Sequence, residues 1–224
     1  MCGGGPRGLR PGQTPRKLRR MGSPPDEHSA AAELGLPLTF HLRDGRTGVI
    51  RAAIEDDAEE LCRLLPQIDR ETDFVPRLPG EFKKTADDLR ARIRESSDPE
   101  SVFLVVEVEG RLVGSGGAAA QGLRRFRHQR EFGFAVLKDY WHEGIGRRLT
   151  ACLLHWAQQR GLHKLHLQVA YDNERAIALY RSFGFTEEGR LVDHAQRADG
   201  SYRDVLLMAL FLDESGHAPS HDLA

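Results

Sequence analysis

At its centre the chain reads Phe132-Gly-Phe-Ala-Val-Leu-Lys-Asp-Tyr-Trp-His-Glu-Gly-Ile-Gly-Arg-Arg-Leu-Thr150. Large apolar residues alternate with small ones as far as Val136, which predicts a β-strand that ends before Asp139. Gly144 and Gly146 then remove side chains where the backbone turns, so that main-chain amides can face outward. After the turn, an apolar residue recurs at helical spacing, at Ile145, Leu149, Cys152 or Leu153, and Trp156. We therefore predict a strand, a tight glycine turn and an amphipathic helix in direct succession.

The first turn of this helix carries Arg147 and Arg148, although acidic residues are preferred at the positive end of a helix dipole. An anion bound at the turn would account for the exception, because helix N-terminal amides and two guanidinium groups together can cradle a phosphate. An ordinary strand–turn–helix connection with two solvated arginines accounts for it equally well. Both interpretations fit this stretch alone.

The composition predicts one ordinary globular domain with appendages. The chain has 224 residues, of which 40% are hydrophobic and 29% charged, and its formal net charge is -1. No overall field therefore favours nucleic acid or a membrane, and the longest apolar run, Val205–Leu212, is too short to span a bilayer. Three scattered cysteines are too few for a disulfide framework or a zinc site, so we expect no metal and a reduced, cytoplasmic protein.

The segments before the central strand predict two helices and a hairpin. A helix begins near Ile54 with the acidic run 55–60 as a solvated first turn, and Pro66 should end or kink it. Thr85, followed three residues later by an aspartate, predicts a capping box for the second helix. A turn at Gly110 predicts a hairpin over residues 102–120.

Two other stretches have more than one interpretation. Gly114-Ser-Gly-Gly-Ala-Ala is similar to a dinucleotide-binding fingerprint, but that motif requires a following helix. A basic loop and another strand follow here, so we reject a dinucleotide site and expect the small residues to allow close backbone packing. The basic run 124–130 predicts a solvated loop or, alternatively, a surface that attracts an acidic substrate.

A family resemblance rests on two motifs. Residues 139–149 resemble the acetyl-CoA signature Q/R-x-x-G-x-G/A of the GCN5-related N-acetyltransferases (GNAT), with Trp141 departing from the pattern at the Q/R position. One strand further on, the chain is similar to the family motif N-x-x-A-x-x-x-Y-x-x-x-G-F, matched at Asn173, Ala176, Tyr180, Gly184 and Phe185.

This resemblance implies an α/β (α+β) domain with a mixed, largely antiparallel sheet of six or seven strands flanked by helices. We expect the domain to cover residues 48–212, between a Gly/Pro-rich basic tail at 1–47 and a flexible tail at 213–224. The family's cofactor is acetyl-CoA, whose binding residues here would be the backbones of Val136 and Leu137, the turn residues His142, Glu143, Gly144, Ile145, Gly146, Arg147 and Arg148, and Asn173 with Tyr180.

The same resemblance implies catalytic roles. Tyr180 would be the general acid, since a phenol with a reference pKa of about 10 can protonate a thiolate. Glu131 matches the family pattern E-x-G-x-x-V and would be the general base, although an ordinary strand-edge glutamate fits the sequence almost as well. Asp73 and Phe74 lie in a turn-rich loop between two predicted helices, which either contacts the acceptor substrate through these two residues or is only a connector.

The predicted function is therefore transfer of an acetyl group to a primary amine, and we expect this amine to belong to a small molecule. A protein N-terminus or lysine as acceptor, and a non-catalytic acetyl-CoA-binding module, are the alternatives. Nucleic-acid binding by residues 7–20 is a third hypothesis. Because dimers are common in the family, the resemblance also allows a homodimer.

Overall fold

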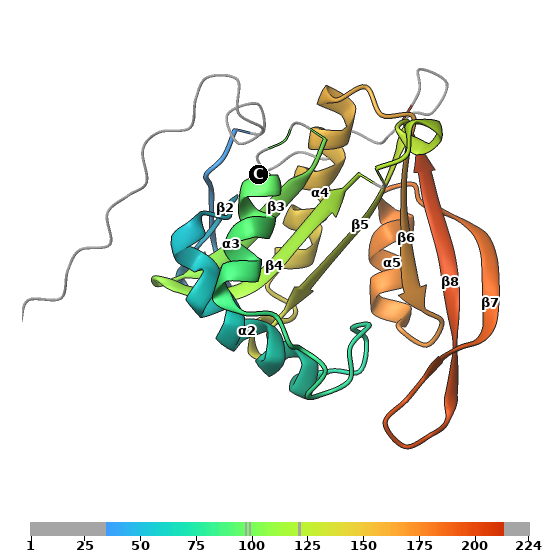
Figure 1. The fold of residues 1–224 in the computed structure, drawn as a ribbon, viewed down its shortest axis with the longest axis horizontal. Coiled ribbons are helices and arrows are strands. Elements are labelled where there is room, and N and C mark those ends of the chain that lie inside the picture. Colours follow the sequence, from blue (N-terminus) through green and yellow to red (C-terminus); the bar gives the residue numbers. More distant parts are fainter. Residues whose placement is uncertain (1–34, 97, 99, 121, 213–224) are drawn as a thin grey trace, which may run out of the picture.

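The computed structural model describes residues 35–96, 98, 100–120 and 122–212. They form an eight-stranded sheet in the order β1-β2-β3-β4-β5-β6-β8-β7 (Figure 1). The strands are β1 (Leu38–His41), β2 (Thr47–Ala52), β3 (Val102–Val108), β4 (Arg111–Ala119), β5 (Gln129–Val136), β6 (Lys164–Ala170), β7 (Thr186–Gln196) and β8 (Tyr202–Phe211). Every neighbouring pair is antiparallel except β5 and β6, which are parallel. The predicted mixed, largely antiparallel sheet is confirmed.

Four helices within the described residues flank this sheet: α2 (Ala58–Glu71), α3 (Ala86–Glu95), α4 (Ile145–Gln159) and α5 (Glu174–Ser182). The ring of Phe132 on β5 packs against Tyr180 of α5, whereas the adjacent Gly133 lines a cavity together with Arg92 of α3. Since successive strand residues point to opposite faces, α3 and α5 cover opposite faces of the sheet. β3 is buried along almost its whole length and forms the centre of the core.

β5 and β6 diverge, and this divergence creates the feature on which the site depends. They pair only from Gln129 to Glu131 on β5 and from Lys164 to His166 on β6. Beyond that point no pairing continues, and Figure 1 shows the two strands spreading apart toward the glycine turn. Within the described part of the chain, one edge of β5 after Glu131 therefore pairs with no strand.

The sheet has at least one strand more than the predicted six or seven, and the additional strand is β1. Residues 38–41 were expected in the N-terminal tail but pair with β2 from Leu38 to His41. Four residues are too few to show a clear alternation in the sequence, which is why the pattern missed them. The domain therefore begins earlier than residue 48, while the expectations for residues 1–34 and 213–224 lie outside the described residues.

The first helix differs from the sequence prediction in two respects. Pro66 does not end α2, which continues for five residues to Glu71 because the buried residues Leu64, Leu65 and Ile68 keep its apolar face in the core. The acidic run is not wholly solvated either. Asp57 is completely buried and pairs with Arg51 of β2 through both carboxylate oxygens, at 2.7 and 2.8 Å.

Other local predictions are confirmed. Thr85 and Asp88 form the predicted capping box at the start of α3. β3 and β4 form the predicted hairpin, and β4 is followed by no helix before the short turn at residues 124–126. A Cβ atom added to Gly116 would lie 2.5 Å from Cβ of Phe134 on β5, so this glycine is required for close strand packing.

Candidate functional site: a glycine turn beside diverging strands

The glycine turn leaves the N-terminus of α4 without a capping side chain. His142 and Gly144 both have left-handed backbone conformations, with φ of 66° and 74°. Gly144 is the N-cap of α4, so no side chain caps the helix, and no acidic residue lies in its first turn. The first helical hydrogen bond runs from the Arg148 amide to the Gly144 carbonyl at 3.2 Å, and the preceding amides have no partner within the helix. This arrangement fits an anionic group such as a pyrophosphate.

The two arginines of this turn have different environments. Arg147 is exposed, with its guanidinium 5.3 Å from the centre of the Phe183 ring and Nη1 3.5 Å from Oγ of Ser182. Arg148 folds back across the turn, stacks over Phe40 of β1 at 4.8 Å and donates to the Glu143 carbonyl at 3.4 Å. Arg147 is therefore the better placed of the two to reach an anion in solvent, and Arg148 also supports the turn.

Several contacts fix the remaining residues of the turn. The carboxylate of Glu143 accepts a hydrogen bond from the Arg43 amide at 2.7 Å, so its side chain is committed to the β1–β2 connection. Nε2 of His142 lies 3.0 Å from Nη1 of Arg175 on α5, whose guanidinium stacks over Trp141 at 4.5 Å.

Trp141 itself donates from Nε1 to the Val136 carbonyl at 2.8 Å. The residue that departs from the family signature thus anchors the turn to β5. The sequence indicated neither this role nor that of Arg175.

The two predicted backbone sites on β5 differ in availability. The Leu137 amide donates to the Val113 carbonyl of β4 at 2.9 Å, so it does not face the gap between β5 and β6. Hydrogen-bonding groups alternate in direction along a strand, and Val136 therefore points its amide away from β4 and toward the gap. The Leu137 amide is thus occupied by β4, whereas the Val136 amide remains a candidate for binding the cofactor.

Tyr180 and the glycine turn lie close together, because both pack against Phe134. Its ring is 8% exposed and packs against Phe132, Phe134 and Phe185, with ring centres 5.9 to 6.2 Å away. Phe134 also lies beside Gly146, where an added Cβ would be 3.3 Å from the ring. Burial raises the pKa of the Tyr180 phenol above its ordinary value, so the phenol keeps its proton at neutral pH.

Asn173 caps the helix that carries Tyr180. Its Oδ1 accepts a hydrogen bond from the Ala176 amide at 3.2 Å. Asn173 is thus the N-cap of α5, and its side-chain NH₂ group remains available as a donor.

Glu131 lies away from these groups. It is exposed on β5, where alternation places it on the face opposite Phe132 and Tyr180. Five residues separate it from Val136, which is about 16 Å along a strand. It lines a cavity of about 420 Å³ with Arg92 and Glu95 of α3. The structure therefore does not bring Glu131 into direct contact with Tyr180 or with the end of β5.

His166 is a neighbour of Glu131 that sequence reasoning did not single out. The two residues are paired in register across β5 and β6. Nε2 of His166 is buried and has no hydrogen-bond partner among the described residues. Burial lowers the pKa of this imidazole, while the Glu131 carboxylate acts in the opposite direction. A neutral imidazole beside a carboxylate can pass protons between neighbouring groups.

Asp73 and Phe74 have a structural role that the sequence did not reveal. Arg203 of β8 is 8% exposed and donates to the Asp73 carbonyl and to its carboxylate, both at 2.6 Å. The same guanidinium stacks over the Phe74 ring at 5.1 Å and pairs with Asp172, the residue before Asn173, at 3.1 Å. The Asp73 carboxylate is thus neutralised by Arg203, which leaves the half-exposed Phe74 as the better candidate for contact with an acceptor.

The described residues also bear on metals and membranes. No group of three or more His, Cys, Asp or Glu side chains among them could hold a metal ion. None of the helices in this part of the chain is long and apolar enough to cross a membrane.

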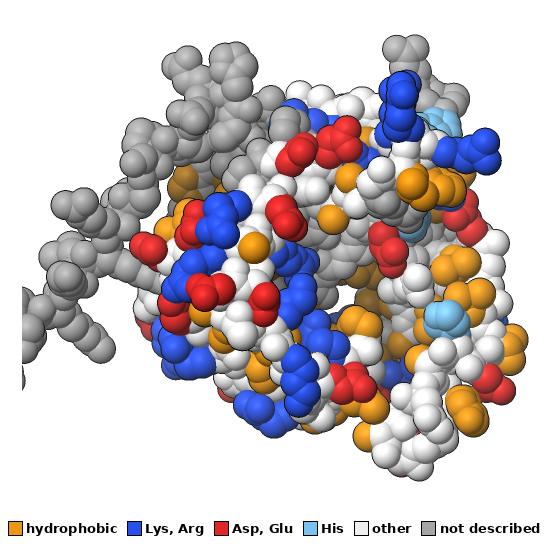
Figure 2. All heavy atoms as spheres, viewed as in Figure 1, with side chains coloured by type: hydrophobic (Ala, Val, Ile, Leu, Met, Phe, Trp, Pro, Cys, Tyr) orange, Lys and Arg blue, Asp and Glu red, His pale blue; other side chains and the backbone are white. Residues whose placement is uncertain are grey.

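Figure 2 shows the molecular surface hollowed between the α2 side of the molecule and the β6–β8 side, where the strands diverge.

Comparisons with known proteins agree with this geometry. The model of the Acetyltransferase (GNAT) family matches residues 65–185. The chain is 39% identical over 79 residues to the [Ribosomal protein bS18]-alanine N-acetyltransferase of Escherichia coli (strain K12), a match that covers 35% of this chain and 53% of the relative. It is 30% identical over 108 residues to the Spermidine N(1)-acetyltransferase of the same organism, covering 48% and 56%. The chain thus spans about half the length of these curated relatives.

A solved structure covers more of the chain. The acetyltransferase of the GNAT family from Streptococcus pneumoniae superposes with a TM-score of 0.71 at 29% sequence identity, over 73% of this chain and 99% of that structure.

Proposed function

Because the chain belongs to the Acetyltransferase (GNAT) family, we propose that it transfers an acetyl group from acetyl-CoA to the primary amine of a small molecule. The observation that carries this proposal is one juxtaposition. The uncapped, basic N-terminus of α4 and the buried phenol of Tyr180 both contact Phe134, at the place where β5 loses its partner strand.

Each part of this arrangement has a role in the proposal. The amides of residues 145–147 and the Arg147 guanidinium bind the pyrophosphate, and the Val136 amide, on the open edge of β5, binds the donor beside the thioester. Acetyl-CoA supplies a thioester carbonyl that an amine can attack. Asn173 and Trp141 hold α5 and the turn in place around this position.

Tyr180 provides the proton that the departing thiolate needs. A thiol has a pKa near 8.5, below that of a phenol, so this proton transfer is uphill by itself; formation of the amide drives it, and the tyrosinate then regains a proton from solvent. The raised pKa of Tyr180 ensures that the proton is present at neutral pH. The aromatic side chains around it exclude water from the ring.

The amine must lose a proton before it attacks, since an alkyl ammonium has a pKa of about 10.4. Glu131 is the proposed final acceptor of this proton, which must reach it along a chain of several waters, because about 16 Å of strand separates Glu131 from Val136. The adjacent His166 imidazole is placed to relay it.

A second acceptor class has its own support. The relative with 39% identity is named for acetylating an alanine of a ribosomal protein, whereas the spermidine enzyme matches over more residues but at 30%. A protein N-terminus is therefore the alternative acceptor. The hydrogen bonds from Arg203 to Asp73 favour a small molecule as the acceptor, because they fix the loop after α2 against β8 beside the hollow.

The test is release of coenzyme A thiol at saturating acetyl-CoA with three acceptors: spermidine, free amino acids and a peptide with an N-terminal alanine. We expect turnover with a small amine and a much lower rate with the peptide. Preference for the peptide would replace the small-molecule proposal by the alternative. Saturable acetyl-CoA binding without turnover of any amine would contradict the enzymatic assignment.

A further inference from the structure

The loop between α2 and α3, residues 72–85, is fixed beside the open end of β5. Glu71, the last residue of α2, accepts a hydrogen bond from the Lys138 amide at 2.8 Å. Lys138 lies two residues beyond Val136, or roughly 7 Å along an extended chain. The α2–α3 loop therefore begins close to the place where the proposed function puts the thioester.

A second contact fixes the same loop on the side of α5. Arg203 of β8 donates to Asp73 and stacks over Phe74. Nη2 of the same guanidinium also donates to Oδ2 of Asp172 at 3.2 Å, and Asp172 directly precedes Asn173, the N-cap of α5. The loop around Phe74 is thus held both at the end of β5 and at the start of α5, the two elements that form the proposed site.

The two carboxylates nearest to Phe74 in the sequence differ in their partners. Asp73 forms an ion pair with Arg203, with Oδ2 and Nη2 2.6 Å apart. Within the described part of the chain, the donors to Glu71 are uncharged: the main-chain amide after β5 described above and, at 2.8 Å, the side-chain amide of Gln67. Neutral donors do not cancel the charge of a carboxylate, so one negative charge remains here to attract an ammonium ion.

Phe74 adds an apolar surface to this place. The residue is 39% exposed although its ring is large and hydrophobic, and Leu78, further along the loop, is 37% exposed. The guanidinium of the buried Arg203 lies over the Phe74 ring at 5.1 Å, so the ring is held in position while it remains in contact with solvent. An aromatic ring fixed in this way can bind an apolar group at little cost in conformational entropy.

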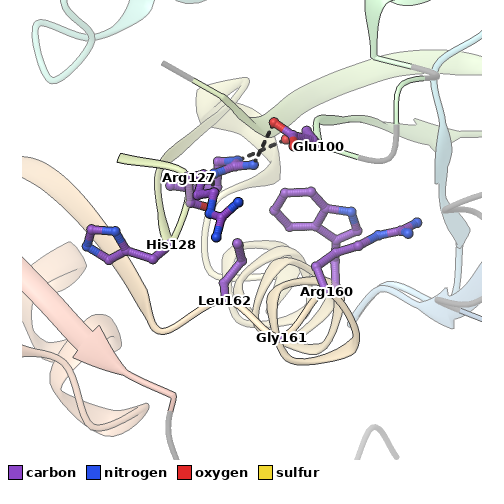
Figure 3. Close-up of a pocket in the computed structure, with 8 residues that line it drawn as sticks. Glu100, Arg127, His128, Arg160, Gly161 and Leu162 are labelled. Carbon is purple, nitrogen blue, oxygen red and sulfur yellow. Dashed lines mark hydrogen bonds and ion pairs between the residues drawn. The ribbon is translucent and has the colours of Figure 1, made fainter. Parts of the chain in front are cut away.

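The cavity at the other end of α4 is too distant to hold the acceptor. It has a volume of about 340 Å³ and lies where α4 ends (Figure 3), and the fifteen residues of α4 separate it from the glycine turn by roughly 22 Å. Its lining includes the buried Arg130, so the basic run 124–130 is not wholly solvated. The hollow between the α2 side and the β6–β8 side (Figure 2) is instead bordered by the α2–α3 loop, and it is the place for the acceptor.

We propose, on the basis of the acetyl-transfer function proposed above, that the acceptor is a monoamine with an apolar body. Glu71 attracts its ammonium group to the end of β5, and its apolar body packs on the exposed part of the Phe74 ring. Arg203 is a positioning residue, because it holds this ring without touching the acceptor. A polyamine fits less well, since the Asp73 carboxylate is already paired and offers no charge to a second cation.

The test is release of coenzyme A thiol at saturating acetyl-CoA with phenethylamine, ethanolamine and spermidine. We expect the highest kcat/KM with phenethylamine. Phe74→Ala should lower this value by about tenfold or more, as expected for loss of a buried apolar contact, and should leave that of ethanolamine unchanged. Phe211→Ala is the matched control, because Phe211 is 42% exposed and lies under the Lys164 ammonium at 5.4 Å, but at the other end of β8 from Arg203.

A second variant tests the positioning role. Arg203→Lys keeps the positive charge but loses the guanidinium fork, and it should raise the KM of phenethylamine by about threefold or more. The KM of ethanolamine and the affinity for acetyl-CoA should stay nearly unchanged. A purely structural defect would instead weaken acetyl-CoA binding or lower kcat with every amine, and that result would overturn the positioning role.

The outcomes separate this inference from the proposed function. A higher kcat/KM with ethanolamine or spermidine than with phenethylamine overturns the inference and leaves acetyl transfer standing. An equal loss for all three amines in Phe74→Ala, or the same loss of phenethylamine turnover in Phe211→Ala, does so as well. Binding of acetyl-CoA without thiol release with any amine contradicts the proposed function, and this inference with it.

Discussion

Replacing Tyr180 by phenylalanine removes the proposed proton donor and little else. The ring would keep its packing against Phe132, Phe134 and Phe185, because all three contacts are between ring faces or edges. We therefore expect the free energy of unfolding to change by less than about 1 kcal/mol. The rate is different, because loss of a general acid typically costs 10²- to 10⁴-fold, or about 2.7 to 5.4 kcal/mol in activation free energy.

The assay is steady-state release of coenzyme A thiol, with kcat and KM measured for both substrates. Tyr180→Phe should lower kcat by about 100-fold or more and leave the acetyl-CoA KM nearly unchanged. Tyr171→Phe is the matched control, since Tyr171 is an exposed tyrosine just before α5 that stacks against Arg190, outside the site. A Tyr180→Phe variant with normal unfolding and normal kcat would refute the assignment of Tyr180 as the acid.

Three further predictions concern stability and reactivity. Arg51→Ala leaves the fully buried Asp57 without its bidentate partner and should lower the free energy of unfolding by about 3 to 5 kcal/mol in urea denaturation, whereas Arg94→Ala, which removes an exposed ion pair, should cost less than about 1 kcal/mol. The main-chain amide of Thr85 holds the pKa of the Asp88 carboxyl below its usual value, so this carboxylate stabilises the fold above about pH 4. The contribution is lost as the pH falls through the folded pKa. In Asp88→Asn, the free energy of unfolding should therefore fall less steeply with decreasing pH in this acidic range. Burial raises the pKa of Cys152 to about 11, so peptide mapping after thiol labelling at pH 8 should find it unmodified in the native chain and modified in guanidinium chloride; labelling of native Cys152 would contradict its buried position.

The sequence predicted the parts of this fold that depend on local periodicity and on turn chemistry. The strand–glycine–helix unit, the β3–β4 hairpin and the Thr85 capping box all lie within short windows whose residue types determine them. The short strand β1 was missed because its four residues carry no pattern. Pro66 does not end α2, because burial of the α2 face outweighs one lost hydrogen bond.

The site was less predictable where it depends on contacts between distant segments. Nothing near Asp73 in the sequence indicates that Arg203, 130 residues away, neutralises it. The indole of Trp141 replaces a polar residue of the family signature, yet its bond to Val136 is visible only in three dimensions. Leu137 and Val136 differ by a single step of strand alternation, which sequence alone fixes only when the register with β4 is known.

The measurement that tests the account most directly is calorimetric titration of acetyl-CoA into the wild-type chain and into Arg147→Gln. If the glycine turn holds the pyrophosphate, the wild-type chain binds saturably. The variant should then bind about tenfold or more weakly, since a hydrogen bond to a charged group contributes about 1.5 to 3 kcal/mol. Arg181→Gln, at an exposed arginine near the end of α5, should bind as the wild type does. No binding of acetyl-CoA, or equal affinity in all three proteins, would contradict the assignment of the turn.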